Sequence, residues 1–159
     1  RQPGFDRCPV IVAERAVGLT ALQLHGAAAM AALPDLRQGP WRIIAVLRAA
    51  GTLLEAADAL PPDAGLLVEC GRGVLPGGNG AVWRWADAAP LAACRPFAVA
   101  GGITPDTAVE AVRAARASAV DVSSGVEAAP GRKDLDLVRR LIERLRAAYG
   151  GPAATVFRR

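Results

Sequence analysis

The chain has 159 residues, of which 52% are hydrophobic and 21% are charged, and its net charge is +4. This length suits a single domain, and the aromatic share of 4% indicates a core built mainly from alanine, leucine and valine. The sequence lacks an apolar run of about 18 residues, a signal-peptide pattern and a basic run mixed with aromatic residues. We therefore expect a cytoplasmic protein that binds neither a membrane nor nucleic acid.

Five short apolar runs recur along the chain and predict β-strands. Each run is mostly apolar without alternation, which is typical of strands that are buried on both faces of a parallel sheet. The predicted strands cover residues 19–26, 41–47, 64–71, 96–102 and 119–125.

Helical patterns lie between and after these runs. In "TPDTAVEAVRAARA", Thr104 is the expected N-cap and Pro105 the first helical residue. The last helix, "LDLVRRLIERLRAAYGG", has its apolar residues on one side and is expected to stop at Gly150. We expect residues 150–159 to form a disordered tail.

The alternation of strands and helices predicts an α/β fold with right-handed crossovers between parallel strands. A doubly wound sheet and a closed barrel both remain possible at this point. The "GVLPGGNG" stretch lacks the spacing and context of a dinucleotide-binding turn. The polar residues and glycines fall just after the strands, where both folds build their sites.

Two of these strand exits, "VAGGI" and "DVSSGVE", predict a phosphate site when they are taken together. The backbone amides of Gly101, Gly102, Ser124 and Gly125 and the hydroxyls of Ser123 and Ser124 would converge at one edge of the sheet. Glycine allows phosphate oxygens to approach the amides closely. The alternative is that both stretches are ordinary turns.

A metal site and a disulfide framework are not indicated. The three cysteines, Cys8, Cys70 and Cys94, are widely spaced, and His25 is the single histidine. We expect no metal.

Five stretches in order and spacing, "LQLHG", "GGNG", "AGGITPDTAVEA", "AVDVSSGVE" and "PGRKD", resemble the phosphoribosylanthranilate isomerases of tryptophan biosynthesis. The resemblance implies an incomplete TIM (βα)8 barrel with about strands four to eight present. Residues 1–149 would then be the C-terminal two-thirds of one barrel domain, and strands one to three would be missing. On this interpretation we expect the 159-residue chain alone to be inactive.

The resemblance also implies a reaction, an Amadori rearrangement of a small phosphorylated substrate. An acid protonates the ribosyl ring oxygen while a base removes the C2 proton, and no cofactor is needed. The family's base is a cysteine in a "KICG"-like motif that this sequence does not contain. Cys8 and Cys70 do not match it, since residues around Cys8 read as the start of a helix and Cys70 should point away from Glu69. The resemblance leaves a monomer or a homodimer open.

Five further residues take expected roles from the resemblance. Glu69 stands where the family has its acid, an aspartate, and is our candidate general acid. Asp121 matches an aspartate on the last strand, and an inward position there would bury its carboxylate. His25 matches the family histidine, and Gly78 and Gly80 lie in a loop expected to close over substrate. The alternatives are that Glu69 is a surface or ion-paired group and that His25 is a hydrogen-bonded structural residue.

Other departures and interpretations remain. Arg84 replaces the aspartate of the family's "FDW", and Trp85 is expected to pack against the helices. A non-catalytic phosphate-binding homologue would also fit Glu69, Arg84 and the short chain. Another phosphate-binding barrel, such as indole glycerol phosphate synthase or an epimerase, shares the phosphate site but not the "DVSSGVE" stretch.

Overall fold

The computed structural model describes residues 18–49, 52–70 and 83–150. Its main element is a parallel sheet with strand order β1-β2-β3-β4-β5, which is the order of the strands along the chain. All five predicted strands are present, although most are shorter than predicted and β2 runs past its predicted end. The strands are β1 (Ala21–Leu24), β2 (Arg42–Ala49), β3 (Gly65–Cys70), β4 (Ala98–Ala100) and β5 (Ala119–Asp121).

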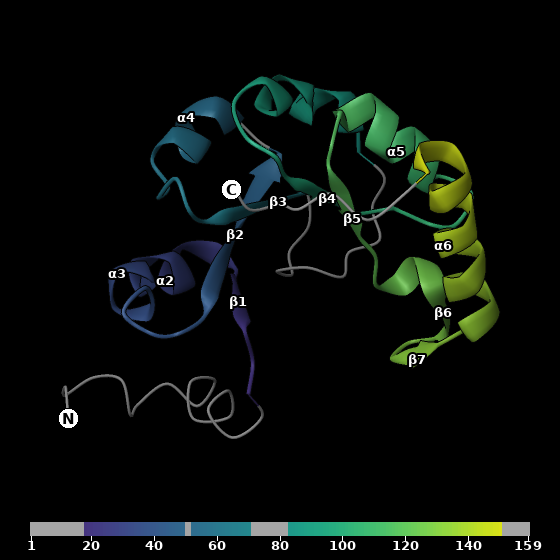
Figure 1. Cartoon of the computed structure of the whole chain (residues 1–159), viewed down its shortest axis with the longest axis horizontal. Coiled ribbons are helices and arrows are strands. Elements are labelled where there is room, and N and C mark those ends of the chain that lie inside the picture. Colours follow the sequence, from purple (N-terminus) through teal and green to yellow (C-terminus); the bar gives the residue numbers. More distant parts are fainter. Residues whose placement is uncertain (1–17, 50–51, 71–82, 151–159) are drawn as a thin grey trace.

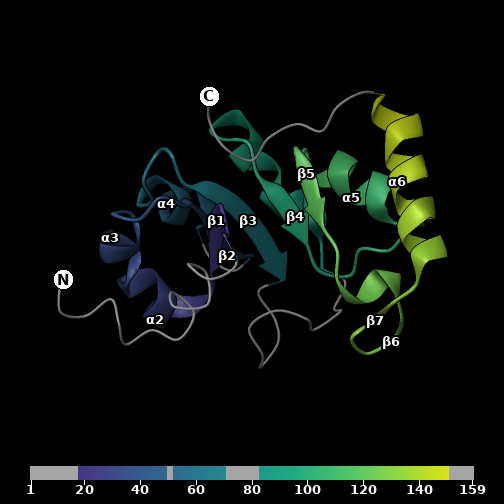
Figure 2. The same ribbon diagram turned by 60° about the horizontal axis from the view of Figure 1, so that its bottom comes forward.

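The helices lie on the outer, convex side of this curved sheet (Figures 1 and 2). None of the described helices is long and apolar enough to cross a membrane. The helices are α2 (Gly26–Ala31), α3 (Leu33–Leu36), α4 (Leu53–Asp58), η2 (Trp85–Ala93), α5 (Ala108–Ala115), η3 (Ser124–Val126) and α6 (Leu135–Tyr149), and a small hairpin of β6 (Glu127–Ala129) and β7 (Arg132–Lys133) precedes α6.

The strand order decides between the two architectures left open by the sequence. A doubly wound sheet reverses its strand order at a switch point and carries helices on both faces. Here the order never reverses, and successive crossovers place the helices on one side. The described strands form an open, curved sheet with β1 and β5 at its edges, not a closed barrel.

The two faces of the sheet are filled by alternate residues of the same strands. On the helix side, Leu66, Val68 and Phe97 pack against α5 and η2 in the largest core cluster. On the concave side, Val46 and Leu67 pack with small alanines of β4 in a separate cluster. Successive strand residues point to opposite faces of the sheet. A strand residue two positions after a member of this second cluster therefore also faces the concave side.

The final helix follows its predicted bounds. Asp134 is the N-cap of α6, and its carboxylate accepts hydrogen bonds from the amides of Asp136 and Leu137 at 2.9 and 3.2 Å. The helix ends at Tyr149, with Gly150 as its C-cap. The predicted disordered tail from residue 151 onward lies outside the described residues.

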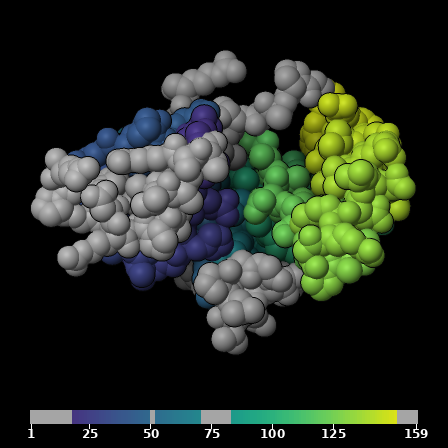
Figure 3. Space-filling view, turned by 90° about the horizontal axis from the view of Figure 1, so that it is seen from below, coloured from purple at the N-terminus to yellow at the C-terminus, as the bar shows by residue number. Residues whose placement is uncertain are grey.

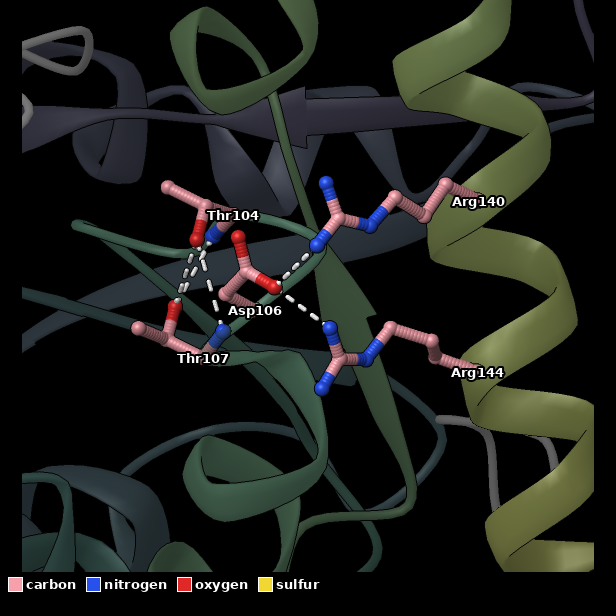
Figure 4. A network of polar contacts seen from close by, with 5 residues as sticks. All are labelled: Thr104, Asp106, Thr107, Arg140 and Arg144. Atoms are coloured by element: carbon pink, nitrogen blue, oxygen red, sulfur yellow. Dashed lines mark hydrogen bonds and ion pairs between the residues drawn. The ribbon is translucent and has the colours of Figure 1, made fainter.

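A shared set of polar contacts joins the start of α5 to α6 (Figure 4). Thr104 and Thr107 cap one another, since each side-chain oxygen accepts from the other's backbone amide, at 3.3 and 2.9 Å. The predicted start of this helix was wrong by three residues, because α5 begins at Ala108 with Thr107 as its N-cap, and Thr104 lies in the turn before it. Asp106 lies between Arg140 and Arg144 of α6 and pairs with both.

Arg95 is a buried charge that no sequence pattern indicated. Its side chain is 5% exposed and donates to the carbonyl oxygens of Ala57 at 3.0 Å, Pro61 at 2.9 Å and Pro62 at 3.3 Å, and also to that of Ala64. The first of these carbonyls belongs to the last turn of α4, and the other three belong to the segment that leads from α4 into β3. The guanidinium therefore fixes the segment that connects α4 to β3. In this way it helps to set the position of β3 and of the acidic residue near the end of that strand.

Replacing Arg95 with methionine should destabilise the fold by about 3 kcal/mol, because several buried carbonyls lose their donor while the side-chain volume is nearly kept. Urea unfolding of the purified chain measures this free energy. The matched control is Arg84→Met, which removes an exposed pair with Asp87 at 2.7 Å and should cost less than about 0.5 kcal/mol. Equal losses in the two variants would contradict the assigned role of Arg95.

Candidate active site

Glu69 lies at the end of β3 on the concave face and is 8% exposed. Its Oε1 atom lies 3.6 Å from Nε of Arg48 and 3.7 Å from Nδ1 of His25. Register explains the first contact, because Arg48 and Glu69 are paired positions of β2 and β3. The structure thus rejects a surface position for Glu69, but it shows the ion pair of the alternative interpretation, with the buried carboxylate between Arg48 of β2 and His25 after β1.

His25 follows β1 and is in contact with the side chain of Gln23, two residues earlier. The Gln23 amide nitrogen lies 3.0 Å from Nε2 of His25. Because a side-chain amide nitrogen only donates, this contact makes Nε2 the acceptor and leaves the Nδ1 proton on the side of Glu69. The expected hydrogen-bonded structural role of His25 and its predicted place at the site are thus both compatible with its position.

Sequence reasoning missed Arg48 and Gln23. Arg48 lay just beyond the predicted end of its strand, which the structure extends to Ala49. The position of Arg48 could have been predicted from the spacing of Ile44, Val46 and Arg48. These residues alternate along one strand, and the first two face the concave side, so the third should face it too.

The turn after β4 has two consecutive glycines in the left-handed region. Gly101 has φ +88° and Gly102 has φ +68°. A Cβ on Gly101 would lie 3.2 Å from Nε1 of Trp83 and 3.4 Å from the backbone nitrogen of Cys70. Both the backbone angle and the neighbouring indole therefore require glycine at the first of the two predicted phosphate-binding stretches.

The two predicted phosphate-binding stretches are in direct backbone contact. A Cβ built on Gly125 would lie 1.8 Å from the carbonyl oxygen of Ile103 and 3.2 Å from Cα of Thr104. The turns after β4 and β5 thus touch at Gly125, while the convergence of their amides and hydroxyls on one ligand stays a prediction. The reason for the glycine differs from the one expected, because at Gly125 the close neighbour is the adjacent turn.

The "PGRKD" stretch supplies a lysine that binds the turn after β5. Lys133 donates to the backbone oxygen of Ser123 at 2.9 Å and to its hydroxyl at 3.3 Å, and pairs with Glu127 at 2.6 Å. This hydrogen bond from the ammonium group holds the pKa of the Glu127 carboxyl below its ordinary value. One side chain of the β6–β7 hairpin thereby holds the turn that carries Ser123 and Ser124, both of which are exposed.

Asp121 differs from its prediction in one respect. It pairs in register with Ala100 and so lies on the concave face with Glu69, but it is exposed, whereas an inward position was expected to bury it. The physical reason is that β5 is an edge strand of the described sheet, so no strand lies beyond it to cover the carboxylate.

Several other predictions fall outside the described residues or concern cysteines. Gly78, Gly80 and Cys8 lie outside the residues that the structure describes. Cys70 is buried and Cys94 is exposed. Among the described residues, no three histidine, cysteine or acidic side chains gather as a metal site.

Seen from below, the concave face is hollowed, and teal and green strand atoms lie deeper between the N-terminal and C-terminal elements (Figure 3). Glu69 lies in the last two residues of β3, and the two glycine-bearing turns follow β4 and β5, so all three lie at the carboxyl ends of neighbouring strands. Parallel α/β folds place catalytic and phosphate-binding groups at this edge.

A family model described as N-(5'phosphoribosyl)anthranilate (PRA) isomerase matches residues 9–144. The chain belongs to this family. The N-(5'-phosphoribosyl)anthranilate isomerase of Bradyrhizobium sp. strain BTAi1 is 43% identical over 137 residues, which is 80% of this chain and 61% of that protein. The corresponding protein of Haloferax volcanii is 39% identical, over 86% of this chain and 62% of its own length. The chain therefore spans about three-fifths of the curated relatives that it matches.

Solved structures agree with this family and with the fold. The phosphoribosyl anthranilate isomerase of Thermus thermophilus superimposes with a TM-score of 0.69 at 32% identity, over 87% of this chain and 66% of that one. That of Thermotoga maritima gives a TM-score of 0.71 at 26% identity, over 87% and 67%. The described sheet thus has the arrangement of strands and helices found in phosphoribosylanthranilate isomerases.

Replacing Gly125 with alanine should cost about 3 kcal/mol of unfolding free energy, because the methyl group overlaps backbone atoms that cannot move as a flexible side chain would. Gly131→Ala is the matched control. Gly131 has φ +75° and open space around it, so only backbone strain of about 1 to 2 kcal/mol is expected. Urea unfolding compares the two, and a smaller loss at Gly125 than at Gly131 would refute the close contact.

The Glu127–Lys133 pair predicts a pH-dependent contribution to stability. Because the folded pKa of Glu127 is lowered, the pair stabilises the fold above about pH 4.5, the ordinary value, and its contribution is lost as pH falls through the folded pKa. The difference in unfolding free energy between the parent chain and Lys133→Met should therefore be largest at pH 7 and narrow as the pH falls below about 4.5, leaving the part due to the hydrogen bonds of Lys133 with Ser123. A difference that stays constant over this range would contradict the prediction.

Proposed function

We propose that the protein to which this chain belongs is an N-(5'-phosphoribosyl)anthranilate isomerase of tryptophan biosynthesis. It converts its substrate to 1-(2-carboxyphenylamino)-1-deoxyribulose 5-phosphate. The observation that carries this proposal is the buried carboxylate of Glu69 at the same edge of the sheet as two packed glycine-bearing turns, in a chain of this family.

Glu69 takes the role of general acid in this proposal. The rearrangement opens the ribosyl ring when a proton reaches the ring oxygen and the C1–O bond breaks, which leaves a C1=N iminium. Removal of the C2 proton gives an enolamine, which becomes the aminoketone as C1 gains a proton and the C2 hydroxyl loses one. The substrate and the product contain the same atoms, so the reaction is an isomerisation. Arg48 of the adjacent strand β2 and His25 after β1 lie 3.6 and 3.7 Å from the Glu69 carboxyl and keep it among basic groups on the concave face.

The turns after β4 and β5 hold the other end of the substrate. Amides of Gly101 and Gly102, with Ser124, Gly125 and the Ser123 hydroxyl, are the proposed donors to the phosphate oxygens. Asp121 lies on the same face as Glu69 and is proposed to meet the sugar or amine part. One neighbouring structure, 25% identical over 87% of this chain and 65% of that one with a TM-score of 0.67, is described as a complex with reduced 1-(o-carboxyphenylamino)-1-deoxyribulose 5-phosphate, which supports a ligand of this class.

The finer architecture is also part of the proposal. The five strands would be strands four to eight of a (βα)8 barrel, with the described sheet as one side of its wall. Support comes from the sequential parallel order, the single outer layer of helices and the curvature of the sheet.

Growth of a tryptophan auxotroph that lacks the isomerase tests the function directly. The coding region that contains this chain should restore growth, and Glu69→Gln should lower kcat of the purified protein by about 10²- to 10⁴-fold, because the amide cannot donate the proton. Glu69→Asp keeps the acid and should retain activity within about 10²-fold. The exposed Glu110→Gln is the control and should leave kcat unchanged.

Two outcomes would contradict the proposal. Full activity of Glu69→Gln would remove Glu69 from the acid role. A protein that binds phosphate but neither restores growth nor turns over substrate would support the alternative, a non-catalytic phosphate-binding homologue.

A further inference from the structure

Three consecutive backbone carbonyls at the end of β4 accept hydrogen bonds from side chains. The Ala100 oxygen accepts from the indole nitrogen of Trp83 at 2.9 Å, and the Gly101 oxygen accepts from that of Trp85 at 3.1 Å. The Gly102 oxygen accepts from the Thr107 hydroxyl at 3.3 Å. The stretch so held is the first of the two proposed phosphate-binding turns.

Holding a carbonyl also orients the amide of the next residue. In a trans peptide the C=O and N–H bonds point in opposite directions, and no cis peptide occurs among the described residues. The contact of Trp83 with the Ala100 oxygen therefore turns the Gly101 amide away from the indole. In the same way, the contact of Trp85 with the Gly101 oxygen orients the Gly102 amide.

The surroundings make these orientations hard to change. Trp85 is 7% exposed and packs in the main core, and Trp83 packs against the same cluster. Trp83 lies so close to Gly101 that a Cβ there would be 3.2 Å from its Nε1 atom. Consecutive glycines at positive φ are flexible when left alone, so their conformation depends on such external contacts.

We propose that Trp83 and Trp85 are positioning residues for the phosphate group of the substrate. They bind the carbonyl side of two peptide groups and so present the Gly101 and Gly102 amides to a phosphate monoester, which neither indole touches. This inference rests on the proposed function, because it assumes that the turn binds phosphate. The inference gives a role in substrate binding to both tryptophans. The sequence predicts packing of Trp85 against the helices and indicates no role for Trp83.

The test uses Trp83→Phe and Trp85→Phe, which keep an aromatic ring and remove the indole N–H. Inorganic phosphate is the probe, followed by the ¹⁵N–¹H resonances of Gly101 and Gly102 during titration. In the parent chain both resonances should shift with phosphate. Each variant should bind phosphate about three- to tenfold more weakly, the range of one hydrogen bond. In the active protein KM should rise in parallel while kcat is largely kept.

Trp41→Phe is the matched control. Its indole also donates to a buried backbone carbonyl, that of Leu36 at 2.8 Å, but it lies in a separate cluster beside β1. It should lose stability without losing phosphate affinity. Phosphate affinity in Trp83→Phe and Trp85→Phe equal to that of the parent would overturn the inference and leave the proposed function standing. A parent chain whose glycine resonances ignore phosphate would overturn the phosphate site itself and the inference with it.

Discussion

The in-register pairing of parallel strands is the constraint on which the rest of this structure depends. Val46, Leu67 and Ala98 occupy one level of the concave face, and the next level, two residues further along, carries Arg48 and Glu69. A slip of one residue in any pair would send its side chains to the helix side. Apolar packing lower in the sheet therefore fixes which charged groups meet at its edge, and Arg95 contributes by holding the crossover that leads into β3.

The turns that follow the strands are held in place by contacts between side chains and backbone atoms. The turns after β4 and β5 touch through Gly125 and the Ile103 oxygen, so neither can move alone. Trp83 and Lys133 bind backbone oxygens of the first and second turn, from opposite directions along the chain. Because a trans peptide points its carbonyl and amide in opposite directions, these bonds also set the direction of the amide that follows each carbonyl.

The strands were predictable because continuous apolar runs bounded by glycine and polar residues have few other interpretations. The place of Glu69 at the site came from the family resemblance, because an unbroken apolar run does not show which face of the sheet a residue occupies. Arg48 was missed because a basic residue at the end of an apolar run reads as the first residue outside it. Arg95 was missed for a related reason, since sequence alone does not show four carbonyls converging on one guanidinium. The burial expected of Asp121 assumed a neighbouring strand beyond β5, which the described sheet does not have.

The contacts of Glu69 bear on how a longer acid could work where the family has aspartate. The distances from its Oε1 to Arg48 and His25, 3.6 and 3.7 Å, exceed the 2.7–3.2 Å of ordinary N–H···O hydrogen bonds. The Arg48 guanidinium therefore acts on the carboxyl mainly through its charge, whereas His25, whose Nε2 accepts from Gln23, faces the carboxyl with its Nδ1 proton at a similarly long distance. A tight bidentate pair would hold the carboxyl in place and would have to break before proton transfer. In the proposed acid role, this looser arrangement would let the additional methylene group of Glu69 turn the carboxyl toward the substrate without first losing a strong hydrogen bond.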